Sequence, residues 1–573
     1  MTTPISVAQT LAGRELFITG TSGFLGKVLI AHLLHEVPDI GKLHLLVRPT
    51  KTRKLSVSGA DRFKKIALQS PCFRPLRDRY GAGFERLISD KIIIWEGDVT
   101  EPDCGLAEAV VQRLGPVIDV VVHVAGLTDF EPDPKKALEA NTLGATHVLE
   151  LTSRLERAML LHTSTCYVVG QKSGHILEQV ATTTPNGKAI DPEVELAAFE
   201  ALAKGEAGVD QRDPAVKIER AKAATAHARS RGFPNTYTYS KALAELLLTK
   251  KAPLNGTRRP VPLTIVRPAI IECAETFPFE GWNEGINTTG PLLWLIKSWF
   301  RHLPSKGDVR FDVVPVDTCS RAMIGIIAAM LAGKAQPVYQ VGTSSTNPFT
   351  VGRAIELSNL AVRKDLGATN KKPLERWGQR FFDTVAVGAD EDHTFAPNRL
   401  RRLARDLKSL VGSAAGAIPA LRKGKDSADI FLDDMDKSLG RVQRMLDLYR
   451  PFIHDNNWSF DNRNVRALDA LMDDDSRARF GWAGDRIDWR KYWIDVLYPG
   501  LATWSMPLLE NREVPIDAVP AWASPAGLAV CGVAQLPPTP RELPSIDPVK
   551  TMLADDAPAA TLDLVPESLG ATL

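Results

Sequence analysis

The chain has 573 residues, of which 44% are hydrophobic and 24% are charged, so it has the composition of a globular protein with a large core. Its 70 lysines and arginines balance 68 aspartates and glutamates, and this near-neutral charge excludes the global positive field of a nucleic-acid-binding protein. The N-terminus lacks a secretory signal and no apolar run reaches the length of a membrane span, so we expect a cytoplasmic protein with at most peripheral membrane contact.

The first recognisable element is a strand, a glycine-rich turn and a helix. The segment from Leu16 to Gly26, LFITGTSGFLG, begins with a short apolar run and leads into an amphipathic helix over residues 27–34. Its glycine spacing is typical of a turn that binds a dinucleotide, although a merely tight turn would also use glycines here. In the first case the pyrophosphate would lie at the helix N-terminus. The predicted cofactor contacts in this turn are Thr19, Gly20, Thr21, Ser22, Gly23, Phe24, Leu25 and Gly26.

A second strand, predicted over residues 42–47, ends in a basic segment that starts at Arg48. An NAD site usually has an acidic residue at this point, which binds the ribose hydroxyls. Arg48, together with Lys51 or Arg53, instead suits the 2′-phosphate of NADP. The sequence therefore predicts NADP(H) as the cofactor, and the alternative is a solvated basic loop.

The third and fourth predicted strands each end in candidate cofactor residues. Residues 92–96 lead to Asp98 and Val99, where the carboxylate could bond the adenine amino group or serve as a turn residue. Residues 117–124 end at Ala125 and Gly126, whose small size lets a cofactor lie against the backbone.

A helix is predicted to begin at Asn141. The amide of this residue could brace the backbone of the active site, and we count it among the cofactor-binding candidates. The simpler interpretation is an ordinary helix cap, because asparagine is favoured at that position.

A fifth strand over residues 159–162 delivers Ser164 and Thr165 at its carboxyl end, where open parallel sheets place their chemistry. Further along, Tyr237 and Lys241 are four residues apart on a predicted helix and therefore share one face. An ammonium beside a phenol would bring the pKa of the phenol down from about 10. Lys241 could also hold the nicotinamide ribose, and we count Tyr237 and Lys241 among the cofactor-binding candidates as well. A hydroxyl from Thr165 or Ser164 would bond a substrate carbonyl oxygen. A chance pair on a structural helix is the alternative.

A sixth strand, predicted over residues 263–266, ends in Arg267 and Pro268. TGTSGFLG, the Tyr–Lys pair and IVRPA together resemble the extended short-chain dehydrogenase/reductase superfamily. FPFEGWNEG at 277–285 and the segment 314–317 resemble its fatty acyl-CoA reductase branch, and the likeness spans about residues 14–345. The resemblance implies a doubly wound parallel Rossmann sheet that binds NADPH, with Pro268 among the cofactor contacts. It also implies that the catalytic residues are Tyr237, Lys241 and Thr165, with Ser164 as the alternative hydroxyl.

The chain divides into further segments by composition. Residues 1–350 would form the reductase domain, with a polar helical insertion at 171–235 that roofs the substrate side. A basic helical connector is predicted at 351–435, followed at 436–510 by a smaller, mainly helical domain. That domain resembles the one that accompanies alcohol-forming fatty acyl-CoA reductases. The tail at 511–573 is rich in proline and alanine and is predicted to be largely disordered.

Two local features leave alternatives open. The apolar segment 291–303 suits an acyl-chain tunnel wall, a membrane-surface contact or a buried core helix. In the insertion, Lys217, Arg220 and Lys222 could meet coenzyme A phosphates or belong to a solvated helix face. The six cysteines show no zinc-ligand spacing, so we expect free thiols and no metal site. They are Cys72, Cys104, Cys166, Cys273, Cys319 and Cys531.

These features predict an enzyme that reduces long-chain fatty acyl-CoA with NADPH, releases coenzyme A and forms the primary alcohol through a bound aldehyde. The step to the alcohol follows from the resemblance alone. One alternative is a reductase that stops at the aldehyde or acts on carrier-bound thioesters. Another is a non-catalytic NADP-binding scaffold. Chain-length preference and oligomeric state are not predicted.

Overall fold

The computed structural model describes residues 3–514 with internal gaps. The gaps are residues 52–55, 206–208, 211–212, 254–258, 287–288, 298–300, 367–382, 389–435, 437–438 and 511. The predicted tail at 511–573 therefore lies outside the described residues, except for 512–514, and so does most of the predicted connector. Five of the six cysteines are described, and all five are buried free thiols as predicted.

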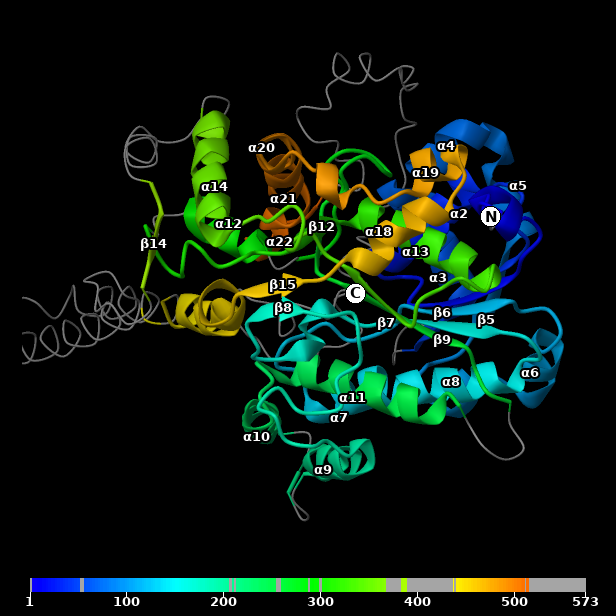
Figure 1. The fold of residues 1–573 in the computed structure, drawn as a ribbon, viewed down its shortest axis with the longest axis horizontal. Helices are drawn as coiled ribbons and strands as arrows, with labels where there is room; N and C mark the ends of the chain where they lie inside the picture. The colour runs from blue at the N-terminus through cyan, green and yellow to red at the C-terminus, as the bar shows by residue number, and fades with distance from the viewer. Residues whose placement is uncertain are drawn as a thin grey trace, which may run out of the picture.

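A seven-stranded parallel sheet forms the centre of the molecule (Figure 1). Its strand order is β13-β9-β7-β6-β1-β2-β5, and every neighbouring pair is parallel. All six predicted strands are present within a few residues of their predicted bounds, whereas β13 was missed. The strands are β1 (Leu16–Thr19), β2 (Leu43–Val47), β5 (Ile92–Glu96), β6 (Val120–His123), β7 (Met159–Thr163), β9 (Leu263–Pro268) and β13 (Val338–Val341).

Helices cover both faces of this sheet, which confirms the predicted doubly wound α/β fold. Alternate strand residues explain the two layers: Ile18 and Val122 pack into one core, while Phe17 and Val121 pack into the other. The first face carries α2 (Phe24–Glu36), α3 (Gly59–Gln69) and α13 (Val316–Leu331). The opposite face carries α6 (Glu108–Leu114), α8 (Gly144–Arg154) and α11 (Thr236–Lys251).

The strand order reverses between β1 and β6, which creates a topological switch point at the carboxyl edge of the sheet. Parallel sheets bind ligands in the crevice at such a point. The turn after β1, the residues after β6 and the end of β7 all meet there. The fold therefore brings together the segments that carry the predicted site residues.

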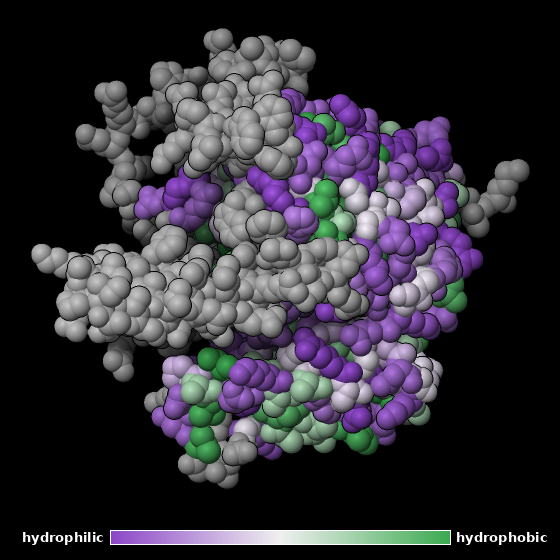
Figure 2. Space-filling model, turned by 90° about the vertical axis from the view of Figure 1, so that its left-hand side faces the viewer, coloured by the Kyte–Doolittle hydropathy of each residue, from purple (hydrophilic) through white to green (hydrophobic). Residues whose placement is uncertain are grey.

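The insertion packs beside α11. Its helices α9 (Pro192–Lys204) and α10 (Pro214–Ser230) contact α11 and the short α7 (Pro134–Ala137). Exposed apolar side chains on these helices include Val194 and Ile218. Hydrophobic areas, drawn in green, are visible on the lower part of the molecule in Figure 2. None of the described residues of the insertion lines the cavity presented below, so the expected roof is supplied there by C-terminal residues instead.

The basic side chains of α10 are largely matched by acidic ones. Arg220 pairs with Asp133, and Lys222 pairs with Glu219 at 2.7 Å. Because Arg220 and Lys222 each have an acidic partner, the interpretation as a solvated helix face is favoured over a binding site for coenzyme A phosphates.

The C-terminal region is mainly helical, as predicted, and packs onto the sheet domain. Its strand β15 (Trp458–Phe460) pairs in parallel with β8 (Gly174–Ile176) of the insertion. Its helices include residues 439–450, a π-helical stretch at Pro451–Asp455, and a second π-helical stretch at Tyr492–Leu497. The others are α18 (Arg463–Leu471), α19 (Asp474–Phe480), α20 (Trp489–Lys491), α21 (Tyr498–Trp504) and α22 (Met506–Leu509). Helix α14 (Val351–Leu366) lies in the predicted connector.

The two ends of the described chain also meet. The backbone N–H of Ile5 donates to the Leu471 carbonyl at 2.7 Å, and Asp473 N–H donates back to Ile5. The N-terminal helix α1 (Val7–Leu11) begins two residues later and contacts α13 and α19. Residues at the start of the sheet domain are therefore held by the C-terminal region.

The apolar segment 291–303 contains parts of a helix and of a strand. Helix α12 (Thr289–Lys297) is mostly buried in the main core, which supports the core-helix alternative. Strand β11 (His302–Pro304) comes later in the segment and pairs with β14 (Val385–Val387). Among the described helices, none combines the length and apolarity that a bilayer crossing requires.

The remaining elements are short. An antiparallel pair of two-residue strands follows β2, and two further helices and two further strands lie between the larger elements along the chain. They are β3 (Thr50–Lys51), β4 (Ser56–Val57), α4 (Arg74–Tyr80), α5 (Phe84–Lys91), β10 (Ile270–Glu272) and β12 (Val313–Pro315).

Candidate active site

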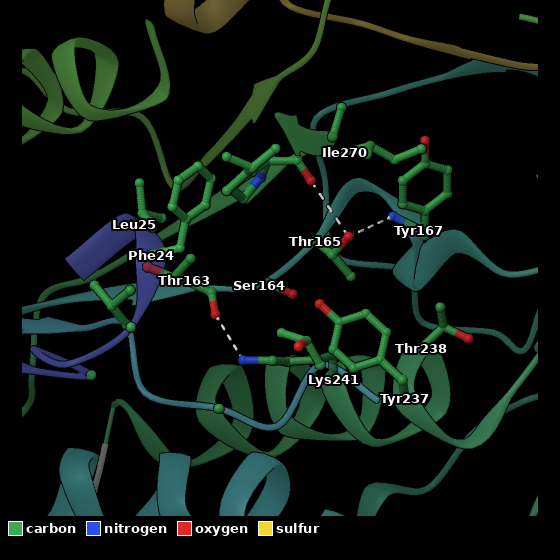
Figure 3. Close-up of a pocket in the computed structure, with 18 of the residues that line it drawn as sticks. Phe24, Leu25, Thr163, Ser164, Thr165, Tyr167, Tyr237, Thr238, Lys241 and Ile270 are labelled. Carbon is green, nitrogen blue, oxygen red and sulfur yellow. Dashed lines mark hydrogen bonds between the residues drawn. The ribbon is translucent and has the colours of Figure 1, made fainter. Parts of the chain in front are cut away.

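A cavity of about 1340 Å³, including its mouth, lies at the switch point of the sheet. All four predicted catalytic residues line it (Figure 3). The lining also contains ten of the predicted cofactor residues and an apolar wall. It consists of Gly20, Gly23, Phe24, Leu25, Gly26, Val124, Ala125, Gly126, Thr128, Phe130, Thr163, Ser164, Thr165, Tyr167, Tyr237, Thr238, Lys241, Pro268, Ala269, Ile270, Ile271, Ile286, Tyr449 and Phe452.

The glycine turn has the shape that a dinucleotide phosphate needs. Gly20 has a φ of +71°, and a Cβ there would lie 2.5 Å from the Ala125 nitrogen. A Cβ on Gly26 would clash with the Gly20 carbonyl, so this glycine allows α2 to pack closely against the turn. Helix α2 begins after Gly23 without a side-chain cap, which leaves its first N–H groups available to an anion. These residues fit a dinucleotide.

Several predicted cofactor residues lie behind the cavity surface. Thr19 is fully buried, bonds His123 Nδ1 at 2.8 Å and accepts the N–H of Ala125 at 3.2 Å. Thr21 donates to the Leu46 carbonyl at 3.4 Å. These side chains hold the turn against its neighbouring strands. Two further predicted residues outside the lining are Ser22, within the turn, and Val99, whose carbonyl accepts from His147.

Asn141 braces the loop that follows β6. It lies in a π-helical stretch, Leu138–Leu143, so it does not open the helix as predicted. Its amide accepts from Leu127 N–H at 2.7 Å and donates to the Leu127 carbonyl at 2.9 Å and to Ser240 Oγ at 3.0 Å. This two-way contact supports the bracing interpretation rather than the cap.

Arg48 and Asp98 lie together at the ends of β2 and β5. Their charged groups are 3.6 Å apart, and the Arg48 side chain is 56% exposed. Asp98 also accepts from Thr100 N–H at 3.0 Å, as a turn residue does. Arg48 is therefore oriented at the edge where an adenosine would lie, while the Lys51 side chain and Arg53 fall outside the described residues.

Tyr237 and Lys241 lie one turn apart on α11 and both face the cavity. The Lys241 ammonium donates to the Thr163 carbonyl at 3.1 Å, and burial lowers its pKa to about 8. Burial raises the pKa of Tyr237 to about 12, while a hydrogen bond with Thr165 acts in the opposite direction. The prediction that Lys241 lowers the pKa of this phenol is wrong here, because desolvation dominates. The phenol remains protonated and suits an acid.

The hydroxyls of Ser164 and Thr165, which follow β7, differ in their hydrogen-bond partners. Thr165 Oγ1 accepts from Tyr167 N–H at 3.4 Å and donates to the Pro268 carbonyl at 3.4 Å. Ser164 Oγ is buried and has no hydrogen-bond partner among the residues that the structure describes. A buried hydroxyl without a partner is costly unless a ligand completes it. Both hydroxyls lie near the oxygen end of Tyr237 (Figure 3).

Two family models match this chain. A family model described as male sterility protein matches residues 18–323, which is more than half of the chain. A second model with the same description matches residues 420–506. The chain belongs to the male sterility protein family.

Similar proteins cover most of the chain. Fatty acyl-CoA reductase 2, chloroplastic, of Arabidopsis thaliana is 28% identical over 518 residues, covering 87% of this chain and 79% of the relative. The alcohol-forming fatty acyl-CoA reductase of Simmondsia chinensis is 26% identical over 510 residues, covering 87% of this chain and 98% of the relative. Among solved structures, the terminal R domain from the myxalamid PKS-NRPS biosynthetic pathway is 18% identical with a TM-score of 0.46, covering 88% of this chain and 92% of that one.

The sequence did not predict the apolar side of the cavity, which includes Phe130, Tyr449 and Phe452. Tyr449 and Phe452 come from the C-terminal region, more than 200 residues after Tyr237, and Phe130 comes from the loop after β6. Tyr449 and Phe452 belong to the segment 436–510, which the sequence predicts only as a helical domain. Their distance along the chain hides their place beside the catalytic candidates.

Proposed function

We propose that this chain reduces long-chain fatty acyl-CoA to the primary alcohol through a bound aldehyde. One observation carries the proposal: the phenol of Tyr237, the ammonium of Lys241 and two strand-end hydroxyls line the same cavity as the glycine turn. The similarity to fatty acyl-CoA reductases supports acyl-CoA as the substrate class.

The residues of the chain would act on the thioester oxygen. A bound nicotinamide dinucleotide supplies the hydride. Tyr237 donates its proton to the carbonyl oxygen, and Thr165 and Ser164 stabilise that oxygen as negative charge develops. The resulting hemithioacetal loses coenzyme A as the thiol and gives the aldehyde. A second round on the retained aldehyde needs a second equivalent of reduced cofactor. Tyr237, reprotonated after the first round, again gives its proton to the carbonyl oxygen, and the product is the alcohol.

We further propose NADPH as the reductant. Arg48 follows β2 at the position where the ribose phosphate of NADP would lie, and more than half of its side chain is exposed. A guanidinium binds phosphate with two parallel hydrogen bonds, which an ordinary ribose hydroxyl does not offer. Asp98 holds the guanidinium in place from one side.

The ratio of NADPH consumed to coenzyme A released tests the proposal. We expect a ratio of two with palmitoyl-CoA, together with hexadecanol as the product. A ratio of one with free aldehyde would show that the enzyme stops after the first reduction. Turnover with an acyl group on a carrier protein, but with none on coenzyme A, would identify the carrier-bound substrate instead. Absence of any turnover would contradict the reductase proposal.

A further inference from the structure

Three aromatic rings form one side of the cavity next to Tyr237. Phe130 lies with its ring centroid 6.2 Å from that of Tyr237. On its other side Phe130 stacks on Phe452 at 5.2 Å and meets Tyr449 edge-on at 6.0 Å. We call Phe130, Tyr449 and Phe452 the aromatic wall. It begins at the catalytic candidate and extends away from it towards the C-terminal region.

The surface that faces this wall is also apolar. Ile270 and Ile271 belong to β10, and Ile286 precedes α12, and all three line the cavity together with the aromatic wall. Such a space, with polar groups concentrated at one end, is suited to an aliphatic chain that carries a single reactive carbonyl. The polar end is the one that holds Tyr237 and the two hydroxyls.

We propose that the acyl chain of the substrate lies along the aromatic wall and that Phe452 sets the chain length that the cavity accepts. This inference rests on the proposed reduction of fatty acyl-CoA. It assigns half of the substrate site to the C-terminal region, in which Tyr449 and Phe452 belong to one helical segment.

Phe452 is the strongest determinant because its surroundings are rigid. Only 3% of the residue is exposed, and its ring meets Tyr167 edge-on at 5.0 Å and Trp458 at 5.8 Å. Tyr167 is itself held edge-on by Trp458 and by a third ring of the C-terminal region. Removal of a side chain from a rigid site leaves a cavity instead of a collapse. A smaller residue at 452 would therefore lengthen the acyl space.

The test uses Phe452→Ala and Phe452→Trp in the full chain, assayed with saturated acyl-CoAs from octanoyl to docosanoyl. Relative to wild type, we expect Phe452→Ala to raise the ratio of kcat/KM for docosanoyl-CoA over palmitoyl-CoA by at least about tenfold, because even one further methylene accommodated in an apolar pocket is worth about that factor. Phe452→Trp should shift the preference to shorter chains. Calorimetric binding of the same acyl-CoAs without NADPH should show the same shift.

Phe349→Ala is the matched control. Phe349 is 2% exposed and packs 4.7 Å from the rings of Trp489 and Trp493, but it does not line the cavity. It should lower stability and leave the chain-length ratio unchanged. If Phe452→Ala does not fold, Phe452→Leu and Phe130→Leu replace it, with smaller shifts expected.

The outcomes separate this inference from the proposed function. An unchanged chain-length ratio in a folded, active variant at position 452 would overturn the role of Phe452. Lack of turnover by the wild-type enzyme on every acyl-CoA would instead refute the proposed reaction, and the binding measurements would then still report whether acyl chains use the aromatic wall.

Discussion

Arg267 at the end of β9 and Glu245 on α11 form a two-point ion pair inside the protein. Arg267 Nε donates to Glu245 Oε1 at 2.8 Å, Nη2 donates to the second oxygen, and both residues are at most 2% exposed. Because α11 also carries Tyr237 and Lys241, this pair fixes the helix of the candidate catalytic residues against the sheet. The arginine of the IVRPA motif is thus a positioning residue.

Glu245→Gln should destabilise the protein by about 3–5 kcal/mol, because it leaves the Arg267 guanidinium buried without its counter-charge. Urea unfolding monitored by circular dichroism would measure the loss. Glu356→Gln is the control, since that carboxylate belongs to an exposed pair with Arg353 and should change stability by less than about 0.5 kcal/mol. A loss equal to that of the control would show that the buried pair does not hold the helix.

Tyr237→Phe should lower kcat by a factor of about 10²–10⁴, the usual contribution of a positioned proton donor, while NADPH binding stays unchanged. Cofactor fluorescence would measure binding, and coenzyme A release would measure turnover. Thr238, the neighbour of Tyr237 on α11, has no role in this mechanism. Its hydroxyl donates to the Asn235 carbonyl at the start of the same helix. Unchanged turnover in Tyr237→Phe would exclude the phenol as the acid.

Ser164→Ala and Thr165→Val should separate the two hydroxyls. Loss of Ser164 removes one donor to the substrate oxygen, so kcat/KM should fall by about 10²–10³. Stability should not fall, because this buried hydroxyl has no partner among the described residues. Loss of Thr165 also removes the cap on Tyr167 N–H and should cost about 1 kcal/mol in stability as well. Steady-state kinetics combined with thermal unfolding distinguish the two patterns. Full activity in Ser164→Ala would leave Thr165 as the only donor.

The pH profile should follow Lys241. Burial lowers its pKa to about 8, so its ammonium is present below that pH and is lost as the pH rises through it. The pKa of Tyr237, about 12, keeps the phenol protonated throughout. NADPH affinity should therefore decline above about pH 8 in a single-proton step. In Lys241→Arg the decline should move to higher pH, and a profile that stays unchanged in this variant would contradict the assignment.

Arg48→Ser should reduce the preference for NADPH over NADH. A charge-assisted hydrogen bond contributes about 1.5–3 kcal/mol, which corresponds to a factor of about 10–150 in kcat/KM for NADPH. The value for NADH should stay within about twofold. Lys42→Ser is a suitable control, because this exposed lysine donates to the Asp90 carbonyl away from the cavity. Equal losses with both cofactors would show that Arg48 does not recognise the 2′-phosphate.

The polar half of the site could be predicted from the sequence because its signals are local. Gly20, Gly26, Tyr237 and Lys241 occur in short patterns whose spacing corresponds to one turn or one helix face. Parallel strands then bring these patterns to one edge of the sheet. For the same reason all six predicted strands were found, since each is a compact apolar run.

The remaining features depend on contacts between distant segments. Nothing in a single sequence shows that Phe452 stacks on Phe130, because no local pattern links residues so far apart. The pKa of Tyr237 was predicted in the wrong direction for a similar reason. Its spacing from Lys241 was visible, whereas the burial that raises it depends on the whole fold. Strand β13 is short and gave too weak an apolar signal.

The contact between Ile5 and the Leu471–Asp473 segment has a consequence for biosynthesis. A ribosome releases the first strand of the sheet long before it has translated the residues that Ile5 pairs with, and Phe452 is also made late. During that interval the nascent polypeptide carries an open, apolar crevice. Folding of the chain can therefore finish only when translation is nearly complete. Until then we expect the incomplete chain to bind chaperones that shield hydrophobic surface.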